Sequence, residues 1–366
     1  NCTGLTGTID FPKNITKIPE EAFAGCIGLT GTLLIPAHID SLGCDALSGT
    51  GFDNLIIADS DVPLWTGDDF NKTGGWIVKS PSYSKRVTVM DGISTPTGMF
   101  ANIPLKKVYI GRNLKYLCGA MLDMGVTRYY YSPFNQAKTI ETITIGNSVD
   151  RLNDYQFSLC TGLKTVVLPD GLKTISKGTF NKDSSLVSIQ IPRSVEVIGS
   201  SAFNLCASLE KVSVGNSHQT TSVESANTVI EDYAFNACEQ LKSIVLSDNV
   251  SSIGDYAFRY CSSLAKIYCM NAVPQSISST AFRFVDTNNC KLYVPTGSSK
   301  AYENALVWNE FMIEEDETLA ITPVKVCNGA VIVARYDLNG HRLNAPIKGI
   351  NILKMSDGTV RKVLVE

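Results

Sequence analysis

The sequence has few of the residues and motifs that carry enzyme chemistry. Its three histidines, His38, His218 and His341, lie in distant regions, so no local His-x-x-x-His metal-ligand pair is present. No Cys-x-x-Cys pair, G-x-S-x-G turn, P-loop or G-x-G-x-x-G loop occurs either. We therefore expect no catalytic residue, no metal site and no cofactor.

An excess of one charge sign and long apolar runs are also absent. Lys plus Arg number 32 against 35 Asp plus Glu, and the net charge of −3 gives no electrostatic case for nucleic-acid binding. No apolar run is long enough to span a bilayer. Charged residues are only 18% of the chain, which is typical of an extracellular, β-rich surface.

The sequence does contain an internal repeat. The pattern Phe-x-x-Cys-x-x-Leu occurs as FAGCIGL from Phe23, FSLCTGL from Phe157, FNLCASL from Phe203, FNACEQL from Phe235 and FRYCSSL from Phe258. The phenylalanines at 157, 180, 203, 235, 258 and 282 are spaced by 23, 23, 32, 23 and 24 residues. A period of this length indicates a solenoid, in which each unit buries its apolar face only by stacking on its neighbours.

One period shows how the side chains are expected to point. In LVSIQIPRSVEVIGSSAFNLCASL, from Leu186 to Leu209, the Leu-x-x-Ile-x-Ile part alternates like a short strand with one buried face. Pro192 and Gly199 favour a bend. The segment around Phe203 then places Ala202, Phe203 and Cys206 on one face of a helical or irregular return.

The repeat cysteines are expected to form a column of small buried groups. There are eleven cysteines, an odd number, so at least one thiol is unpaired within the chain. Six stand at the repeat position, namely Cys2, Cys26, Cys160, Cys206, Cys238 and Cys261. Buried cysteine acting as a small apolar group is favoured over disulfides or metal ligands. Asp183 takes the same position in its repeat, and we expect it to bond backbone amides rather than act as a catalytic acid.

The consensus I-P-x-x-V-x-x-I-G-x-x-A-F-x-x-C-x-x-L-x-x-I resembles the BspA-type leucine-rich repeat of bacterial surface proteins. The resemblance covers residues 1 to 313, most clearly from Thr139. It implies a mostly β fold with short helical turns, a gently curved leucine-rich-repeat solenoid of parallel strands, and secretion with a role in binding or adhesion. It implies no catalytic residues. Because NCTGLTGTIDFP at the start matches GCIGLTGTLLIP from Gly25, we interpret Cys2 as a repeat cysteine rather than an acylated one, and expect any secretion signal or anchor upstream.

Three further segments follow the repeats. Residues 291–313 resemble the end cap of this family, in which Trp308 and Phe311 cover the open end of the stack. Residues 314–320 are acidic and are expected to be a solvated linker, with calcium binding there disfavoured. Residues 321–366 show two alternating β patterns with Asn339-Gly340 and Asp357-Gly358 turns. With Tyr336-Asp337-Leu338-x-Gly340 and Lys362-Val363-Leu364-Val365, they resemble a small C-terminal β module of proteins exported by Bacteroidetes, of which some relatives are sorting tags and others plain terminal domains.

Residues 59–138 depart from the period and hold the candidate binding residues. Asp59, Asp61, Asp68 and Asp69 are best interpreted as solvated loop residues rather than a carboxylate or calcium site. Exposed aromatic side chains dominate recognition surfaces. The candidate binding residues are therefore Trp65, Trp76, Tyr83, Tyr129, Tyr130, Tyr131 and Phe134. The alternative is that the RYYYSPF loop folds back and covers a small core of its own.

These observations favour a secreted or cell-surface scaffold, monomeric and without catalysis. It would recognise a host or environmental protein or glycan through the concave sheet and the irregular loops. Two alternatives stay open. One is an extracellular hydrolase with a site in 59–138, disfavoured because no nucleophile has a nearby base. The other is a purely structural surface protein.

Overall fold

The computed structural model of the chain describes residues 2–43, 45–66, 98–116, 119–123, 126–130, 132–215, 227–317, 319, 332–336, 342–343, 349–355 and 360–365. The chain divides into two compact units. The first comprises residues 1–216 and 222–319, and the second comprises residues 217–221 and 320–366.

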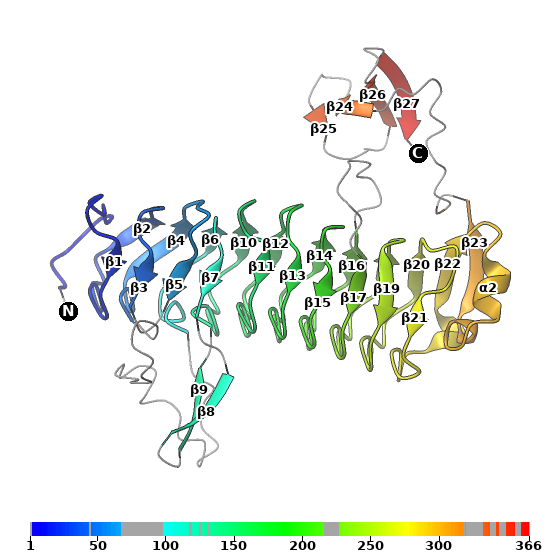
Figure 1. Ribbon diagram of the computed structural model, residues 1–366, viewed down its shortest axis with the longest axis horizontal. Coiled ribbons are helices and arrows are strands. Elements are labelled where there is room, and N and C mark those ends of the chain that lie inside the picture. Colours follow the sequence, from blue (N-terminus) through cyan, green and yellow to red (C-terminus); the bar gives the residue numbers. More distant parts are fainter. Residues whose placement is uncertain are drawn as a thin grey trace. The chain divides into compact units, whose positions relative to one another are not determined.

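The first unit is a stack of turns joined by parallel strands, which confirms the predicted solenoid. Its longer strands form two sheets in the orders β12-β10-β6-β4-β2 and β14-β16-β18-β20-β22-β23. Because β12 lies next to β14, the two sheets follow one another along one side of the stack (Figure 1). These strands are β2 (Thr30–Ile35), β4 (Gly51–Ile57), β6 (Lys107–Ile110), β10 (Thr142–Ile145), β12 (Thr165–Val167), β14 (Ser188–Ile191), β16 (Lys211–Val214), β18 (Ser243–Leu246), β20 (Lys266–Cys269), β22 (Lys291–Pro295) and β23 (Met312–Asp316).

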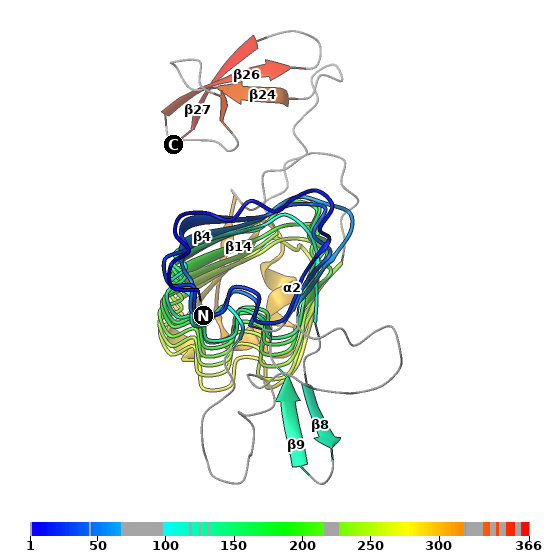
Figure 2. The same cartoon turned by 90° about the vertical axis from the view of Figure 1, so that its left-hand side faces the viewer.

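A second row of strands, which the sequence analysis missed, runs along the stack beside the longer strands (Figure 1). In the end-on view of Figure 2, β4 and β14 of the longer row lie on one side of the turns. Most of its strands have only two or three residues, too few for a period-two pattern. They pair in the orders β1-β3-β5-β7 and β11-β13-β15-β17-β19-β21. Their bounds are β1 (Lys17–Ile18), β3 (Ser41–Leu42), β5 (Leu64–Thr66), β7 (Leu114–Lys115), β11 (Arg151–Leu152), β13 (Thr174–Ile175), β15 (Val197–Ile198), β17 (Thr228–Ile230), β19 (Val250–Ile253) and β21 (Ser276–Ile277).

The return segment that carries each repeat phenylalanine is irregular rather than helical. Ser201 and Leu205, which flank Phe203, have positive φ values of 58° and 60° and interrupt any helix. The amides of Phe203 and Leu205 instead donate to the carbonyls of Ala234 and Asn236 in the next turn, at 2.7 and 2.8 Å. Neighbouring return segments are therefore joined through their backbones, as the strands are.

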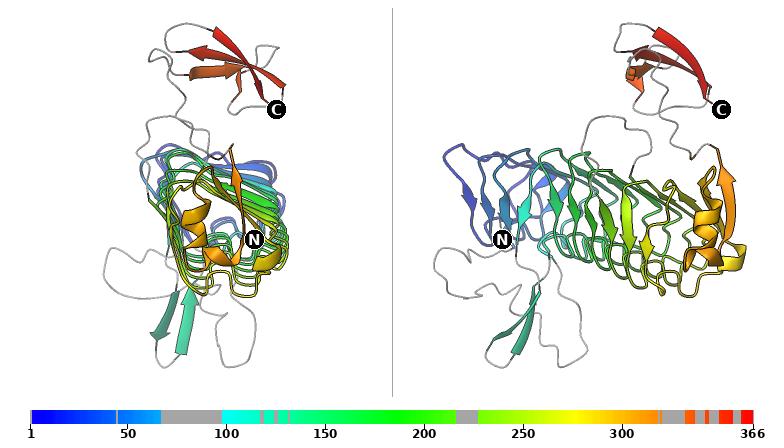
Figure 3. Two further views of the ribbon diagram at one scale, coloured as in Figure 1. Left: turned by 90° about the vertical axis from the view of Figure 1, so that its right-hand side faces the viewer. Right: turned by 45° about the vertical axis from the view of Figure 1, so that its right-hand side comes forward.

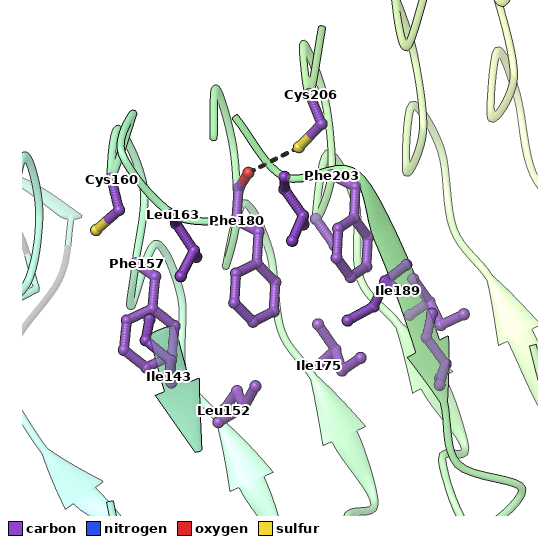
Figure 4. Close-up of a cluster of buried hydrophobic side chains, with 14 of the residues drawn as sticks. Ile143, Leu152, Phe157, Cys160, Leu163, Ile175, Phe180, Ile189, Phe203 and Cys206 are labelled. Atoms are coloured by element: carbon purple, nitrogen blue, oxygen red, sulfur yellow. Dashed lines mark hydrogen bonds between the residues drawn. The ribbon is translucent and has the colours of Figure 1, made fainter. Parts of the chain in front are cut away.

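Buried phenylalanines stack along the interior of the solenoid (Figure 4). The ring of Phe203 lies 5.1 Å from Phe180 and 5.0 Å from Phe235, nearly parallel to both. Beside this ladder, the thiol of Cys206 donates a hydrogen bond to the carbonyl of Phe180 at 3.2 Å, as Figure 4 shows. The thiol of Cys238 donates to the carbonyl of Phe203 at the same distance. Turns that have the repeat cysteine are thus joined to the preceding turn through both a ring and a thiol.

The predicted burial of the repeat cysteines is confirmed for five of the six. Cys26, Cys160, Cys206, Cys238 and Cys261 are free and buried. The prediction is wrong for Cys2, which is exposed. Cys2 lies in the first described turn, and within the described residues a neighbouring turn packs on only one side of it.

Helical elements gather at the end of the stack near β23 (Figure 3). They are η2 (Thr287–Asn289), α2 (Ser299–Glu303) and η3 (Trp308–Glu310). Trp308 and Phe311 are buried against Phe282, the last ring of the ladder, with centroids 6.0 and 5.0 Å away. The expected linker from residue 314 is wrong at its start, because Glu314, Glu315 and Asp316 belong to β23 and pair with β22. The acidic composition of this segment is typical of a solvated linker, and its strand pairing comes from its place beside β22.

Two smaller sheets complete the described structure. The backbone of β8 (Gly119–Asp123) pairs with β9 (Val126–Tyr130) as an antiparallel hairpin. The second unit is an antiparallel sheet in the order β25-β24-β26-β27. Its strands are β24 (Ile332–Tyr336), β25 (Arg342–Leu343), β26 (Gly349–Met355) and β27 (Val360–Val365). Among the described residues, none of the helices has the length and hydropathy of a membrane span.

Candidate binding surface

The described residues contain no obvious reactive centre. No group of three or more His, Cys, Asp or Glu side chains in this part of the chain is placed to hold a metal ion. The Asp59 carboxylate accepts a hydrogen bond from the Tyr109 hydroxyl at 2.8 Å, and Asp61 is exposed. Asp68 and Asp69 lie outside the described residues. Asp183 accepts the Cys160 amide at 2.9 Å, which confirms the expected bond to backbone.

One column of side chains runs across the solvent face of the longer strands. Parallel pairing in direct register places one residue of each strand beside the equivalent residue of the next. Leu34 is opposite Ile56, which is opposite Tyr109, and Tyr268 is opposite Tyr293. We call this the sheet-face column. Its members in the first sheet are Leu34, Ile56, Tyr109, Thr144 and Val167. Its members in the second sheet, which adjoins the first at β12 and β14, are Gln190, Ser213, Val245, Tyr268, Tyr293 and Glu314.

The sheet-face column is largely uncharged and is open to solvent. Leu34, Ile56 and Val167 expose 46%, 38% and 49% of their surface, although they lie in regular strands. Tyr268 and Tyr293 stack with their centroids 4.8 Å apart and their planes at 11°. Burial and the hydrogen bond to Asp59 raise the pKa of Tyr109, which stays a neutral hydroxyl. Leu34 and Ile56 are neighbours in this column, and contiguous exposed apolar side chains mark interaction sites.

A second column, one pleat away, is polar and carries positive charge. Lys107 is opposite Thr142, Lys211 is opposite Ser188 and Ser243, and Lys266 is opposite Lys291. Lys291 pairs with Glu314 of β23 at 2.7 Å. In the described part of the chain, no carboxylate lies within 4 Å of Lys107, Lys211 or Lys266. The sheet therefore offers a largely uncharged column with aliphatic and aromatic members, beside a column that carries ammonium groups.

The candidate residues predicted from sequence are not brought together into one described site. Trp65, in β5, exposes 37% of its surface, and the Lys115 ammonium lies 5.2 Å from its ring centroid. Tyr129 and Tyr130 lie in β9, where their backbones pair with Ala120 and Gly119. Trp76, Tyr83, Tyr131 and the side chains of Tyr129 and Tyr130 lie outside the described residues.

Phe134 is a correction to the predicted binding residues. It is fully buried and lies in the phenylalanine ladder, 4.7 Å from Phe100 and 5.5 Å from Phe157. The sequence assigned it to the irregular region because its turn has Ala137 where most others have cysteine. Its ring packs the core and is not part of a surface.

Sequence reasoning placed recognition on the concave sheet and the irregular loops but did not name the residues of the sheet-face column. No single repeat reveals it, because its members differ in type from one strand to the next. The signal was available in the second outward position of each strand, which is found by aligning the strands at the repeat period. Read down the chain, that position is mostly Leu, Ile, Tyr, Val or Thr rather than a charged residue.

The chain matches a known repeat family and several solved structures. The family model of the BspA type leucine rich repeat region matches residues 1–121, 127–227 and 228–314, in six copies. A leucine rich repeat protein of T. pallidum is 27% identical over 47% of this chain and 72% of its own, with a TM-score of 0.36. A leucine rich cell surface protein from Faecalibacterium prausnitzii is 18% identical over 86% of this chain and 89% of its own, with a TM-score of 0.38. A leucine-rich repeat protein from Bacteroides ovatus is 18% identical over 86% and 84%, with a TM-score of 0.37. No curated protein matched the chain.

Proposed function

Because the chain belongs to the BspA type leucine rich repeat family, we propose that it is a secreted or cell-surface scaffold that binds a macromolecular ligand. The ligand is a protein or a glycan of a host or of the surroundings, and binding involves no catalysis. The sheet-face column carries this proposal. It places aliphatic and aromatic side chains on the solvent face of both sheets of longer strands.

The chemistry of the column suits recognition. Its tyrosines and aliphatic side chains offer contact area at low entropic cost, since the strands already hold them in place. The flanking lysines add positive charge that steers an approaching ligand. None of these contacts needs a reactive group, which agrees with the sparse chemistry of the described residues.

The test is an array of immobilised matrix proteins and glycans, followed by measurement of affinity for whichever ligand is captured. The variant Tyr268→Ser with Tyr293→Ser removes two stacked rings from the column. We expect it to weaken binding about tenfold or more while the melting temperature changes little. The matched control is Val273→Ser with Leu306→Ser, two residues 74% and 75% exposed outside the sheet. If the Tyr268 and Tyr293 variant binds with the same affinity as the wild type, the ligand does not bind at the sheet-face column.

The three consecutive tyrosines at 129–131, which begin in β9, are tested in the same assay. If these tyrosines contact the ligand, the variant Tyr129→Ala, Tyr130→Ala, Tyr131→Ala should lose binding and keep its melting temperature within a few degrees. Trp65→Ala tests the exposed indole of β5 separately. Unchanged binding by both variants would restrict the ligand to the longer strands.

A further inference from the structure

A second exposed group of side chains lies in three successive return segments near the capped end. These segments connect β17 to β18, β19 to β20 and β21 to β22. We call the group the aromatic–arginine cluster, and its members are Tyr233, Tyr256, Arg259, Tyr260, Arg283 and Phe284.

The rings of the cluster stack in two pairs. Tyr233 and Tyr256 have centroids 5.0 Å apart, and Tyr260 and Phe284 have centroids 4.7 Å apart with planes at 8°. The Arg259 guanidinium lies over three of these rings, 4.5 Å from the Tyr260 centroid, 5.3 Å from Tyr256 and 5.6 Å from Phe284. The Arg283 guanidinium lies 5.0 Å from the Phe284 centroid. Stacking of this kind holds a guanidinium in a fixed orientation without neutralising its charge.

Neither guanidinium has an ionic partner among the described residues. Within these ranges, no carboxylate lies within 4 Å of Arg259 or Arg283. Arg259 donates one hydrogen bond to the Tyr260 hydroxyl at 3.2 Å, and its Nε is buried without a partner. The Asp255 carboxylate, nearby in sequence, accepts from Ser278 and Thr280 instead. The cluster therefore holds two oriented cations that no carboxylate of the described chain neutralises.

Packing of the solenoid does not require this cluster. The buried rings of Phe235, Phe258 and Phe282 already fill the interior of these turns. Tyr260 and Phe284 expose 42% and 53% of their surface and adopt positive φ values of 59° and 68°, a costly backbone for bulky residues. Other turns have Gly25, Lys182 or Leu205 at the same position. The rings are thus an addition to the repeat.

We propose that the aromatic–arginine cluster binds an acidic peptide segment of a protein ligand. The inference rests on the proposed function, and specifies one partner chemistry for it. Carboxylates pair with the two guanidiniums, which are suited to bidentate bonds, while apolar groups of the peptide contact the ring edges. A peptide fits better than a carbohydrate, because each ring has one face stacked on another ring and the guanidiniums lie over further ring faces. A pyranose needs an open ring face for stacking.

The first experiment measures peptide binding by fluorescence anisotropy with the full chain. The probes are a fluorescein-labelled peptide Glu-Glu-Tyr-Glu-Glu, its Gln-Gln-Tyr-Gln-Gln counterpart and a labelled hyaluronan oligosaccharide. We expect the Glu peptide to bind best, and to bind more weakly as NaCl is raised. The variant Arg259→Gln with Arg283→Gln should weaken it about tenfold or more, since both charge-assisted bonds are lost.

The matched control is Lys177→Gln with Lys182→Gln. It removes the same charge from exposed positions in the return segment between β13 and β14, where no aromatic pair stands. We expect its affinity for the Glu peptide to stay within about twofold of the wild type, because screened charges at that distance contribute little. Equal loss in both variants would mean that only net charge matters and would overturn the proposal. Equal binding of the Gln peptide, or preferential binding of hyaluronan, would overturn it as well.

A second readout separates this inference from the proposed function. In the array assay, a wild type that captures no macromolecule contradicts the proposed function, whatever the peptide does. A wild type that captures a protein equally well with and without Arg259 and Arg283 contradicts only the role of the cluster. Loss of capture in the Arg259 and Arg283 variant alone supports both.

Discussion

Asp183 stands where most turns have a buried cysteine. Its side chain is fully buried, with Oδ1 accepting the Cys160 amide and Oδ2 lacking a partner among the described residues. Burial raises the pKa of this carboxyl well above its usual value. A protonated carboxyl is a tolerable small polar group in this column, whereas a carboxylate is costly.

Asp183→Asn should therefore stabilise the protein at neutral pH. In the unfolded chain the carboxyl ionises above about pH 3.9, while in the folded chain it stays protonated to higher pH. The unfolded state thus binds fewer protons, and stability falls as pH rises from that value. We expect the substitution to raise the melting temperature at pH 7, by an amount that corresponds to about 1–3 kcal/mol, and to make no difference near pH 3. Thermal melts across this range check it, with the exposed Asp154→Asn as control. A lower melting temperature for Asp183→Asn at pH 7 would show that the ionised form is stabilised after all.

Phe203→Ala tests the phenylalanine ladder. The ring is fully buried between Phe180 and Phe235, so its removal leaves a cavity between two turns. The expected loss is about 3–5 kcal/mol of unfolding free energy, measured by denaturant melts. Leu205→Ala, two residues on and 40% exposed, is the control and should cost far less. Equal losses would contradict the inward assignment of Phe203.

Individual residues could be predicted from sequence where they repeat and not where they vary. Phe203 and Cys206 were placed correctly, because their burial follows from the period. The aromatic–arginine cluster was missed, because Tyr260 and Phe284 occupy positions that differ between turns. Their contact forms only when two turns stack, so the sequence of one repeat does not reveal it.

At the scale of elements, the longer strands were predictable and the shorter ones were not. The alternation in β14 shows which face is buried, and the structure has that face inside. Val197 and Ile198 of β15 are too few to show alternation, and their pairing with β13 and β17 comes from the stack. In most turns the return segment has positive φ at one or two positions, which prevents a helix. The apolar pattern carries no signal for these backbone angles, so the sequence alone does not distinguish a helical return from an irregular one.

The cysteine column predicts a pattern of thiol reactivity. Burial raises the pKa of Cys261 to about 12 and that of Cys160, Cys206 and Cys238 as well. Thiols react as thiolates, so these four should resist iodoacetamide in the native protein and react after denaturation. Cys2 is exposed and should be labelled in both states. Mass spectrometry of labelled peptides gives the pattern, and native labelling of Cys206, or its recovery in a disulfide, would contradict the register of the turns.

At the scale of the whole molecule, the solenoid and the C-terminal sheet are separate compact units. The first ends at Leu319, after the aromatic cap has covered Phe282. A chain ending at residue 319 should therefore keep the solenoid's melting temperature within a few degrees. Circular dichroism melts of the shortened and full chains check this. A drop of ten degrees or more would mean that residues 320–366 stabilise the stack. A role of those residues in sorting stays a prediction, testable by their effect on export.

The direct register of the longer strands makes the molecule extensible in fixed steps. Each turn repeats the backbone contacts of the one before, and neighbouring strands lie about 4.8 Å apart. Gene duplication of one period would lengthen the molecule by that increment and leave every other contact unchanged. The length of its strand face is thus set by the number of turns. A change in the number of turns would fit the strand face to a ligand of another length. Substitutions at outward-facing strand positions would change which ligand groups each turn contacts.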